Sequence, residues 1–333
     1  MQESITVPQS ADGTDRQAGN SQRLSKDKVK KILTGSREKN GLIKSVAIYG
    51  LLICIGFIYL YPILYMVSAS FMTLDDLLDS SIRWIPSSVN LDNYRQAGQS
   101  MDYWHSLLQS LLIAGVPTLC TLASCALTGY GLARFRFRGR GLIIGLIIVT
   151  FVLPSQITMI PTYSMYARMK ILNKVWAFII PSMLAQGLNA PIFIMIFWQF
   201  FRTVPQSLVE AAKIDGAGNF KSFFSIALPS AGPAFITVAL FSFVWYWNEF
   251  YLTQLFVHGV LVEEGLTTLI IQVQKFSDNY STYASTAQSG ATSLNESIRM
   301  AGTLIAVLPL MILYFVLQRH FVESIDRTGI TGE

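Results

Sequence analysis

Six long apolar runs alternate with polar segments along the chain, and each is long enough to cross a bilayer. The predicted spans are residues 46–69, 107–133, 141–160, 176–200, 233–257 and 300–318. A transmembrane helix needs ~20 consecutive, mostly apolar residues. The pattern therefore predicts an all-α polytopic membrane protein with six transmembrane helices. Several prolines lie in or beside these runs and predict kinked helices, packed on neighbours that satisfy the carbonyls freed by each proline. They are Pro154, Pro161, Pro181 and Pro191.

Composition supports this class. Of the 333 residues, 52% are hydrophobic and 14% are charged, whereas soluble domains carry roughly 25% charged residues. The three cysteines, Cys54, Cys120 and Cys125, all fall inside apolar runs. Cys120 and Cys125 are five residues apart and point in different directions on a helix, so they do not suit a shared metal. We expect buried, reduced thiols.

The distribution of basic residues predicts the orientation. With the N-terminus inside, 18 of the 25 Lys and Arg residues fall in inner segments and 7 in outer segments. Cytoplasmic loops carry an excess of Lys and Arg. The run from Arg134 to Arg140, with four arginines in seven residues, is the clearest single anchor. Both termini and the loop 202–231 are therefore expected on the cytoplasmic side.

The predicted layout has three parts. Residues 1–44 form a basic cytoplasmic segment that is largely disordered, above all over 1–22. Residues 45–320 form the transmembrane domain, and 321–333 form a cytoplasmic tail. The first span is too long for the apolar part of a signal peptide, so we expect it to be retained.

The loop 202–231 carries the most specific local pattern. Pro205 suits the first position of a helix, and Gly216 stands where a residue with positive φ would end it. Asn219 is a plausible N-cap for a second helix, and Pro229 is expected to end the unit. In that second helix Phe220, Phe223 and Phe224 are expected to share a face, which would need a partner to cover it.

This loop resembles the EAA loop of the permease subunits of binding-protein-dependent ABC importers. The residues that carry the resemblance, with the aromatic face, are Glu210, Ala211, Ala212, Asp215, Gly216, Ala217, Phe220, Phe223, Leu228 and Pro229. In that family the loop forms a coupling helix that docks in a groove on a cytoplasmic ATPase subunit. The resemblance implies a type I ABC importer permease fold in a bacterial cell membrane. It also implies a second homologous permease, two ATPase subunits and an extracytoplasmic solute-binding protein, with no cofactor and no nucleic acid.

The fifth span contains the sequence Trp247-Asn248-Glu249-Phe250, which resembles the fifth-span signature of carbohydrate-importer permeases. A charge inside the bilayer costs at least ~2.5 kcal/mol, so Glu249 is expected to face a partner or a water-filled cavity. Two interpretations stay open. Glu249, Asn248 and Trp247 line the substrate pathway, or they belong to an interfacial belt with Trp245, Tyr246 and Tyr251.

Polar residues also occur in the third and fourth spans: Gln156, Thr158, Gln186 and Asn189. Sugar hydroxyls require such donors and acceptors together with aromatic faces. Hydrogen bonding between helices is the alternative role for each of them. Gln186 and Asn189 are our candidates for the substrate pathway.

Two outer loops and the C-terminus add weaker signals. The stretch from Trp84 to Tyr94 resembles the first extracytoplasmic segment of sugar-importer permeases. The loop 258–299, whose part 277–297 is rich in Ser, Thr, Ala and Asn, is either flexible and solvated or a contact for an external binding protein. The segment 318–322, followed by 327–332, resembles the end of the maltose-type second permease, and the chain departs from that tail at Glu323, Ser324 and Asp326.

The chain contains no Gly-Lys dipeptide, and therefore no P-loop. We expect a non-enzymatic subunit that imports a mono- or oligosaccharide by alternating access, with ATP hydrolysed on a separate subunit. An ion-coupled secondary transporter is the alternative, although such carriers usually hold several intramembrane ionisable residues. A scaffold or sensor ranks third, because the soluble segments are short.

Overall fold

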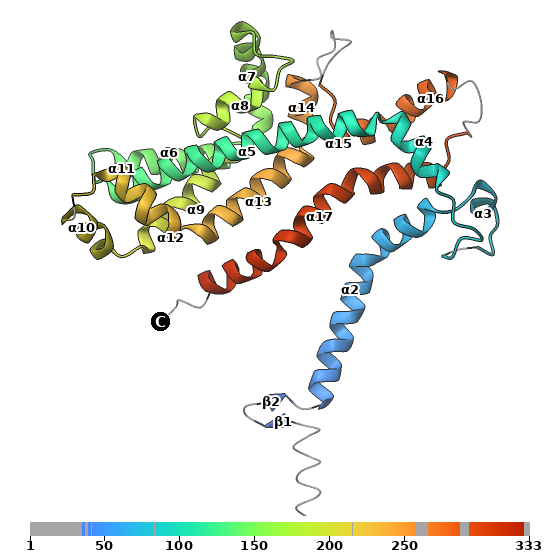
Figure 1. The fold of residues 1–333 in the computed structure, drawn as a ribbon, viewed down its shortest axis with the longest axis horizontal. Coiled ribbons are helices and arrows are strands. Elements are labelled where there is room, and N and C mark those ends of the chain that lie inside the picture. Colours follow the sequence, from blue (N-terminus) through green and yellow to red (C-terminus); the bar gives the residue numbers. More distant parts are fainter. Residues whose placement is uncertain are drawn as a thin grey trace, which may run out of the picture. The chain divides into compact units, whose positions relative to one another are not determined.

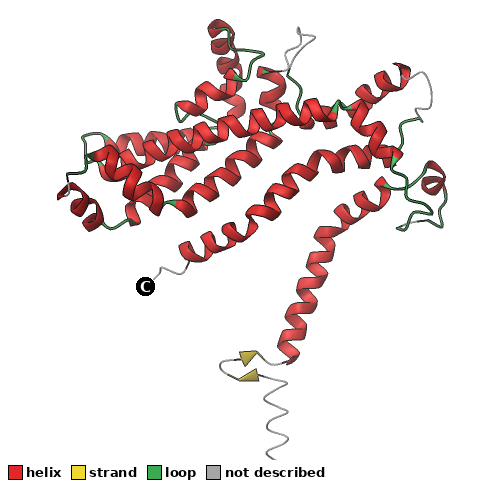
Figure 2. Ribbon diagram, in the orientation of Figure 1, coloured by secondary structure: helices red, strands yellow, loops and turns green. Residues whose placement is uncertain are grey.

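The computed structural model describes residues 35–36, 39–40, 42–82, 84–214, 216–257, 266–286 and 293–329. The expectation of disorder over 1–22 and the motif residue Asp215 lie outside them. The described chain is almost entirely helical (Figure 2). It divides into two compact units, residues 1–66 and 67–333.

The first unit holds a small hairpin and most of the first long helix. Strands β1 (Gly35–Ser36) and β2 (Lys39–Asn40) pair antiparallel. Helix α2 (Leu42–Ser70) then carries apolar side chains on all sides, and no residue of its apolar window is buried. A helix that is hydrophobic all round belongs in a bilayer or against another protein.

The second unit contains the remaining helices, shown in Figure 1. They are α3 (Leu74–Leu78), α4 (Asp92–Ser100), α5 (Tyr103–Arg134), α6 (Arg140–Val152), α7 (Ser155–Met169), α8 (Trp176–Met183), α9 (Ala190–Thr203), α10 (Gln206–Ile214), α11 (Asn219–Ser222), the π-helix η1 (Phe223–Ala227), α12 (Leu228–Ser230), α13 (Gly232–Asn248), α14 (Tyr251–Phe256), α15 (Leu269–Gln274), α16 (Phe276–Thr286) and α17 (Glu296–Gly329). Helix α5 is central and packs along α8, α9 and α13, while α17 packs on α4 and α13.

Three helices are long and apolar enough to cross a membrane, namely Lys44–Ser70, Tyr103–Arg134 and Glu296–Arg319, and up to six spans result if each of three bent pairs counts as one. These helices match the predicted first, second and sixth spans. The last helix, however, continues to Gly329, well past the predicted end at residue 318. A helix can leave the bilayer without a break because its backbone hydrogen bonds are internal.

The predicted third, fourth and fifth spans are wrong as continuous helices. The third bends by 102° between α6 and α7, next to Pro154, which lacks a backbone N–H and restricts the residue before it. The fourth is interrupted between α8 and α9, and the fifth at Glu249 and Phe250. Apolarity alone does not reveal these breaks, because the residues at each break belong to the same apolar run.

The segment 266–286 is ordered, so the interpretation of residues 277–286 as a flexible loop is wrong. Helix α16 packs on α4. Tyr280 is buried and its hydroxyl donates to Gln96 Oε1 at 2.5 Å, while the Tyr283 hydroxyl donates to Gln99 Oε1 at 2.7 Å. The two tyrosine hydroxyls hold the polar segment in place because each is hydrogen-bonded to a glutamine of α4. Residues 287–292 lie outside the described chain.

The three thiols are free, but only one of them is buried. Cys125 lies in the core and its Sγ is 3.8 Å from the carbonyl oxygen of Ala190. Cys120 is half-buried and Cys54 is exposed on α2. The expectation of burial was wrong for Cys54, because an apolar position on a span can face lipid as readily as protein.

Candidate coupling loop and the broken helices behind it

The loop 202–231 forms a bent helical arm at one end of the second unit (Figure 1). Helix α10 begins directly after Pro205, and Gln206 Nε2 donates to Glu210 Oε1 at 2.9 Å. The helix ends at Ile214, Gly216 beyond it has the predicted positive φ of +77°, and Ala217 N donates to Ala212 O at 2.8 Å. This hydrogen bond, between residues five positions apart, is the one expected of a Schellman motif. A Cβ at Gly216 would meet nothing within 4 Å, so its backbone angle, and not lack of space, requires glycine.

The second half of the loop differs from the predicted helix in two details. Gly218 is the residue that precedes α11, and Asn219 is its first residue. The helical path also continues through Pro229 to Ser230, so the sharp turn falls at Ala231 and not at Pro229. A proline is tolerated in the first turn of a helical segment because its N–H would lack a partner there.

The predicted aromatic face divides into inward and outward residues. Phe223 is 3% exposed, whereas Phe220 is 77% exposed and Phe224 57% exposed. The prediction of one shared face is therefore wrong. Residues 223–227 form a π-helix, which has more residues per turn than an α-helix and so breaks the expected spacing.

Phe223 joins the loop to the helix bundle. Its ring centroid lies 4.9 Å from that of Tyr130 on α5 and 6.1 Å from that of Phe201 on α9. The Tyr130 and Phe201 rings are themselves 5.4 Å apart. Pairs at these distances gain about 0.5–1.5 kcal/mol each beyond area burial. The loop is therefore part of the same apolar core as α5 and α9.

The outward surface of the loop is rich in apolar side chains. Glu210, Ala211, Phe220 and Pro229 are exposed, and Ala212, Ala217 and Leu228 are half-buried. Sequence reasoning did not include Leu208 and Ile214, which are 50% and 87% exposed. Their signal was available, since both are large apolar residues in a short polar-looking helix. Exposed apolar groups of this kind mark an interaction surface.

The break between α8 and α9 is held by a polar network in the bundle core. The Tyr246 hydroxyl lies 2.7 Å from Ser182 Oγ and accepts from Leu188 N at 2.9 Å. Ser124 Oγ donates to Ser182 O at 2.5 Å. A Cβ on Gly187 would come within 2.6 Å of the Tyr246 hydroxyl, so position 187 has room for glycine and for no residue with a side chain. The belt interpretation is thus wrong for Tyr246, which is 2% exposed.

Gln186 and Asn189 lie in this break, and both side chains are exposed in the chain. Neither side chain is buried between the helices of this chain, and their role in the substrate pathway stays a prediction. Asn189 has φ +54° and Ala185 has φ +55°, which is uncommon for residues with a side chain. The break therefore presents two amide side chains and irregular backbone at one place.

The break in the fifth span places the other candidates. Glu249 Oε1 accepts from Leu252 N at 2.9 Å, so the carboxylate caps α14. Asn248 is exposed and its Nδ2 donates to Val244 O at 2.9 Å. Trp247 is 7% exposed and stacks on Phe243, with ring centroids 5.6 Å apart. Trp247 is a core residue, which contradicts its assignment to an accessible pathway or belt in the isolated chain.

The two breaks lie at similar heights above the loop. At about 1.5 Å per residue, the 14 residues of α9 and the 17 residues of α13 rise about 21 Å and about 26 Å. The hydrocarbon core of a bilayer is ~30 Å thick. Broken helices at such depth occur where the backbone is buried in protein or lines a cavity. Tyr246 connects the two breaks, because it precedes Glu249 by three residues and binds the backbone at Leu188.

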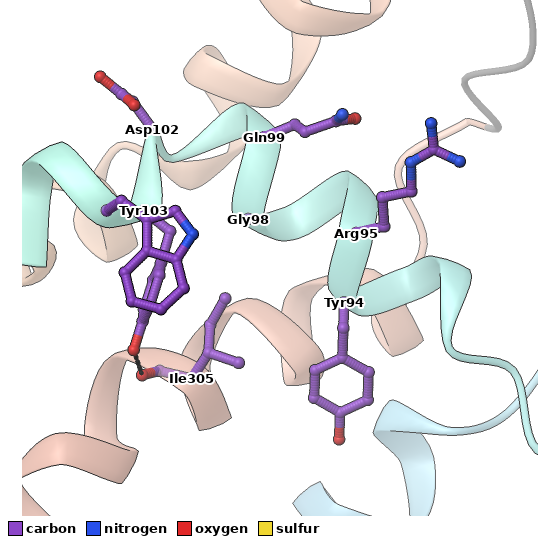
Figure 3. Close-up of a pocket in the computed structure, with 8 residues that line it drawn as sticks. Tyr94, Arg95, Gly98, Gln99, Asp102, Tyr103 and Ile305 are labelled. Atoms are coloured by element: carbon purple, nitrogen blue, oxygen red, sulfur yellow. Dashed lines mark hydrogen bonds between the residues drawn. The ribbon is translucent and has the colours of Figure 1, made fainter.

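A hollow lies at the opposite end of α5 from the coupling loop (Figure 3). Its volume is about 560 Å³, and it combines the aromatic rings of Tyr94, Tyr103 and Trp104 with the polar groups of Arg95 and Asp102. The Tyr103 hydroxyl donates to Ile305 O at 3.2 Å and so joins α5 to α17. Among the described residues, no group of three or more His, Cys, Asp and Glu side chains is placed to hold a metal ion.

A bundle of long apolar helices, several of them broken, together with a protruding helical arm is an architecture that membrane transport subunits use. The sequence from residue 126 to 327 matches the family described as binding-protein-dependent transport system inner membrane component. The chain belongs to this family. It is the permease subunit of an ABC importer in the inner membrane and not an enzyme, since ATP is hydrolysed on a separate subunit. Membership also excludes the ion-coupled alternative.

Two relatives and one solved structure illustrate the similarity. The polygalacturonan/rhamnogalacturonan transport system permease protein YtcP of Bacillus subtilis is 30% identical over 294 residues, which cover 88% of this chain and 100% of the relative. The arabinooligosaccharides transport system permease protein AraQ of Halalkalibacterium halodurans is 29% identical, over 84% of this chain and 93% of the relative. A chain from the crystal structure of a bacterial ABC transporter that imports the acidic polysaccharide alginate has a TM-score of 0.71 at 22% identity, covering 84% of this chain and 98% of that chain. The last comparison shows the shared type I importer permease fold.

Proposed function

We propose that this permease imports a saccharide, either a mono- or an oligosaccharide, by alternating access. The observation that carries the proposal is the likeness, over nearly the whole chain, to permease proteins named for transport of polygalacturonan/rhamnogalacturonan and of arabinooligosaccharides. The complex contains a second homologous permease, two cytoplasmic ATPase subunits and an external solute-binding protein. The basic loops support an orientation with both termini and the loop 202–231 in the cytoplasm.

The loop 202–231 transmits the ATPase movement to the bundle. Its outward residues, with Glu210 and Phe220 exposed, form the docking surface. Its inward residue Phe223 packs on Tyr130 and Phe201, so a displacement of the loop displaces α5 and α9. Both helices run toward the outer half of the bundle, where the break beside Tyr246 carries Gln186 and Asn189. These two amides and the neighbouring Asn248 and Glu249 contact the saccharide during passage.

The experiment that tests this proposal is reconstitution of the tagged chain with the proteins that co-purify with it. We expect an ATPase with Walker motifs and a second permease, and ATP hydrolysis that rises when the sugar-loaded binding protein is added. Glu210→Lys should abolish this stimulation while the protein still inserts into the membrane. Stimulation of the Glu210→Lys complex equal to the wild type would contradict the assigned docking surface.

The substrate requires a separate measurement. The co-purifying binding protein is screened against neutral and acidic saccharides, and uptake of each ligand is followed in proteoliposomes. Gln186→Ala and Asn189→Ala are expected to lower saccharide uptake and leave assembly with the ATPase intact. A binding protein that takes only amino acids or ions would overturn the saccharide and leave the importer family unaffected.

A further inference from the structure

A basic groove lies between the coupling loop and the ends of three helices. Its volume is about 780 Å³, and its lining includes Arg134, Arg136, Arg140 and Arg202 with Glu210. Four guanidinium groups and one carboxylate leave a clear excess of positive charge. Such an excess in a recess attracts an anion.

The arginines come from the ends of apolar helices. Arg134 is the last residue of α5, Arg140 is the first residue of α6, and Arg202 lies in the last turn of α9. These ends meet where apolar spans give way to polar loops. That level is the headgroup region of a bilayer, where basic side chains gather and where lipid phosphates lie.

Part of this charge has no internal partner. Arg134 Nη2 donates to Val204 O at 2.8 Å, whereas its Nε is buried and has no hydrogen-bond partner. A buried N–H that stays unpaired costs free energy. Across the described part of the chain, none of the four guanidinium groups has a carboxylate partner. Glu210, the one acidic group in the lining, accepts a hydrogen bond from Gln206.

An exposed apolar helix face begins at the groove. Helix α6 begins at Arg140 and contains no fully buried residue. Leu142, Leu146 and Val149 are 69%, 54% and 53% exposed, while Ile144 and Ile147 pack against the core on the other side. The groove and this face together offer a site for an anionic group attached to apolar chains. A free phosphate ion would use only the first half of it.

We propose that the groove binds the phosphodiester of an anionic phospholipid, such as phosphatidylglycerol, whose acyl chains lie along α6. Arginine suits this ligand because its planar fork of donors matches phosphate oxygens in a bidentate fashion. The bound lipid contacts the coupling loop, since Gln206, Glu210 and Asn219 also line the groove. Lipid composition therefore acts on the loop that meets the ATPase. The proposal does not depend on which solute is imported.

The test uses the full-length chain, purified with its importer partners, and native mass spectrometry of the lipid that it retains. The complex is offered phosphatidylglycerol and phosphatidylcholine together. Arg140→Gln/Arg202→Gln is expected to retain about 10- to 30-fold less phosphatidylglycerol, since each basic group contributes about 1 kcal/mol near a charged surface. Arg138→Gln/Arg168→Gln removes two exposed charges outside the groove and should change retention less than about 2-fold.

Three outcomes would overturn the proposal: equal losses in the two double variants, no preference for phosphatidylglycerol in the wild type, or displacement of the lipid by inorganic phosphate. The last would assign the groove to a free anion. If the groove double variant fails to assemble, Arg136→Gln and Arg138→Gln give the same comparison with two exposed arginines of one loop. Only Arg136 lines the groove, so only Arg136→Gln should lose lipid, and equal retention by the two would refute the site.

Discussion

The ring of Phe223, on the inner side of the coupling loop, is buried, and its centroid lies 4.9 Å from that of Tyr130. This contact joins the loop 202–231 to the central helix of the bundle. Phe224, the next residue along the chain, is exposed. Two adjacent phenylalanines therefore have opposite tasks, one holding the loop to α5 and α9 and the other available to a partner.

Phe223→Ala should loosen the loop from the bundle. Truncation of a buried Phe to Ala typically costs about 3–5 kcal/mol, because apolar contacts are lost and a cavity remains. We expect a lower melting temperature of the permease and ATP hydrolysis that no longer depends on the loaded binding protein. Phe224→Ala is the matched control, since it should leave the melting temperature unchanged and weaken only ATPase capture. Equal melting temperatures for the two variants would contradict the anchoring role of Phe223.

Gly216→Ala should destabilise the turn of the coupling loop by about 1 kcal/mol, because a side chain disfavours φ +77°. Gly218→Ala provides the control, as Gly218 has φ −68° and the Cβ of alanine would meet nothing within 4 Å. Hydrogen exchange at the Ala217 amide, which closes the turn onto Ala212, reports the difference directly. Exchange that is equally fast in both variants would mean that the turn does not need a glycine at position 216.

Features set by a few neighbouring residues, such as the end of a helix, could be predicted from the sequence. Which side chains face the core could not. Gly216 was predicted correctly because the end of a helix has its own residue signature within a few positions. The inward turn of Phe223 was missed because a π-helix, which has no clear sequence signal, changes the phase of the loop. The helical character of each apolar run was also predictable from length and hydropathy.

The hydrophobic pattern did not predict where the spans are broken. A headgroup belt was one of the two interpretations open for Tyr246, because aromatic residues gather there, but its hydroxyl lies within hydrogen-bond distance of Ser182, 64 residues earlier. Contacts at this separation leave no periodic trace in one sequence. Pro181, Gly187 and Pro191 were local hints of the break, and they were ambiguous because glycine and proline also occur in unbroken transmembrane helices.

Acid should destabilise the segment that follows α2, from Thr73 to Ser87. The hydroxyl of Ser87 and the backbone N–H of Thr73 hydrogen-bond the Asp76 carboxylate and hold its pKa below 3.8. Stabilisation from the ionised group is therefore full above the unfolded-state pKa, near ~3.9, and is lost as the pH falls through the lower folded-state pKa. Thermal unfolding between about pH 6 and about pH 3 measures it. Asp76→Asn should flatten this dependence, and Asp75→Asn, at an exposed neighbour, should retain it.

Gly187→Ala should disrupt the break between α8 and α9, because the added methyl group would lie 2.6 Å from the Tyr246 hydroxyl and 2.7 Å from Ser182 Oγ. Tyr246→Phe tests the same place without a clash, since it removes the oxygen that accepts from Leu188 N. Loss of a partner for a buried N–H costs about 1–3 kcal/mol. We expect lower thermal stability for both variants and reduced uptake for Tyr246→Phe, with Tyr251→Phe, at a 72% exposed tyrosine, as the control. Wild-type uptake and stability in Tyr246→Phe would show that the break is maintained by helix packing alone, and the polar network would then have no role in positioning Gln186 and Asn189.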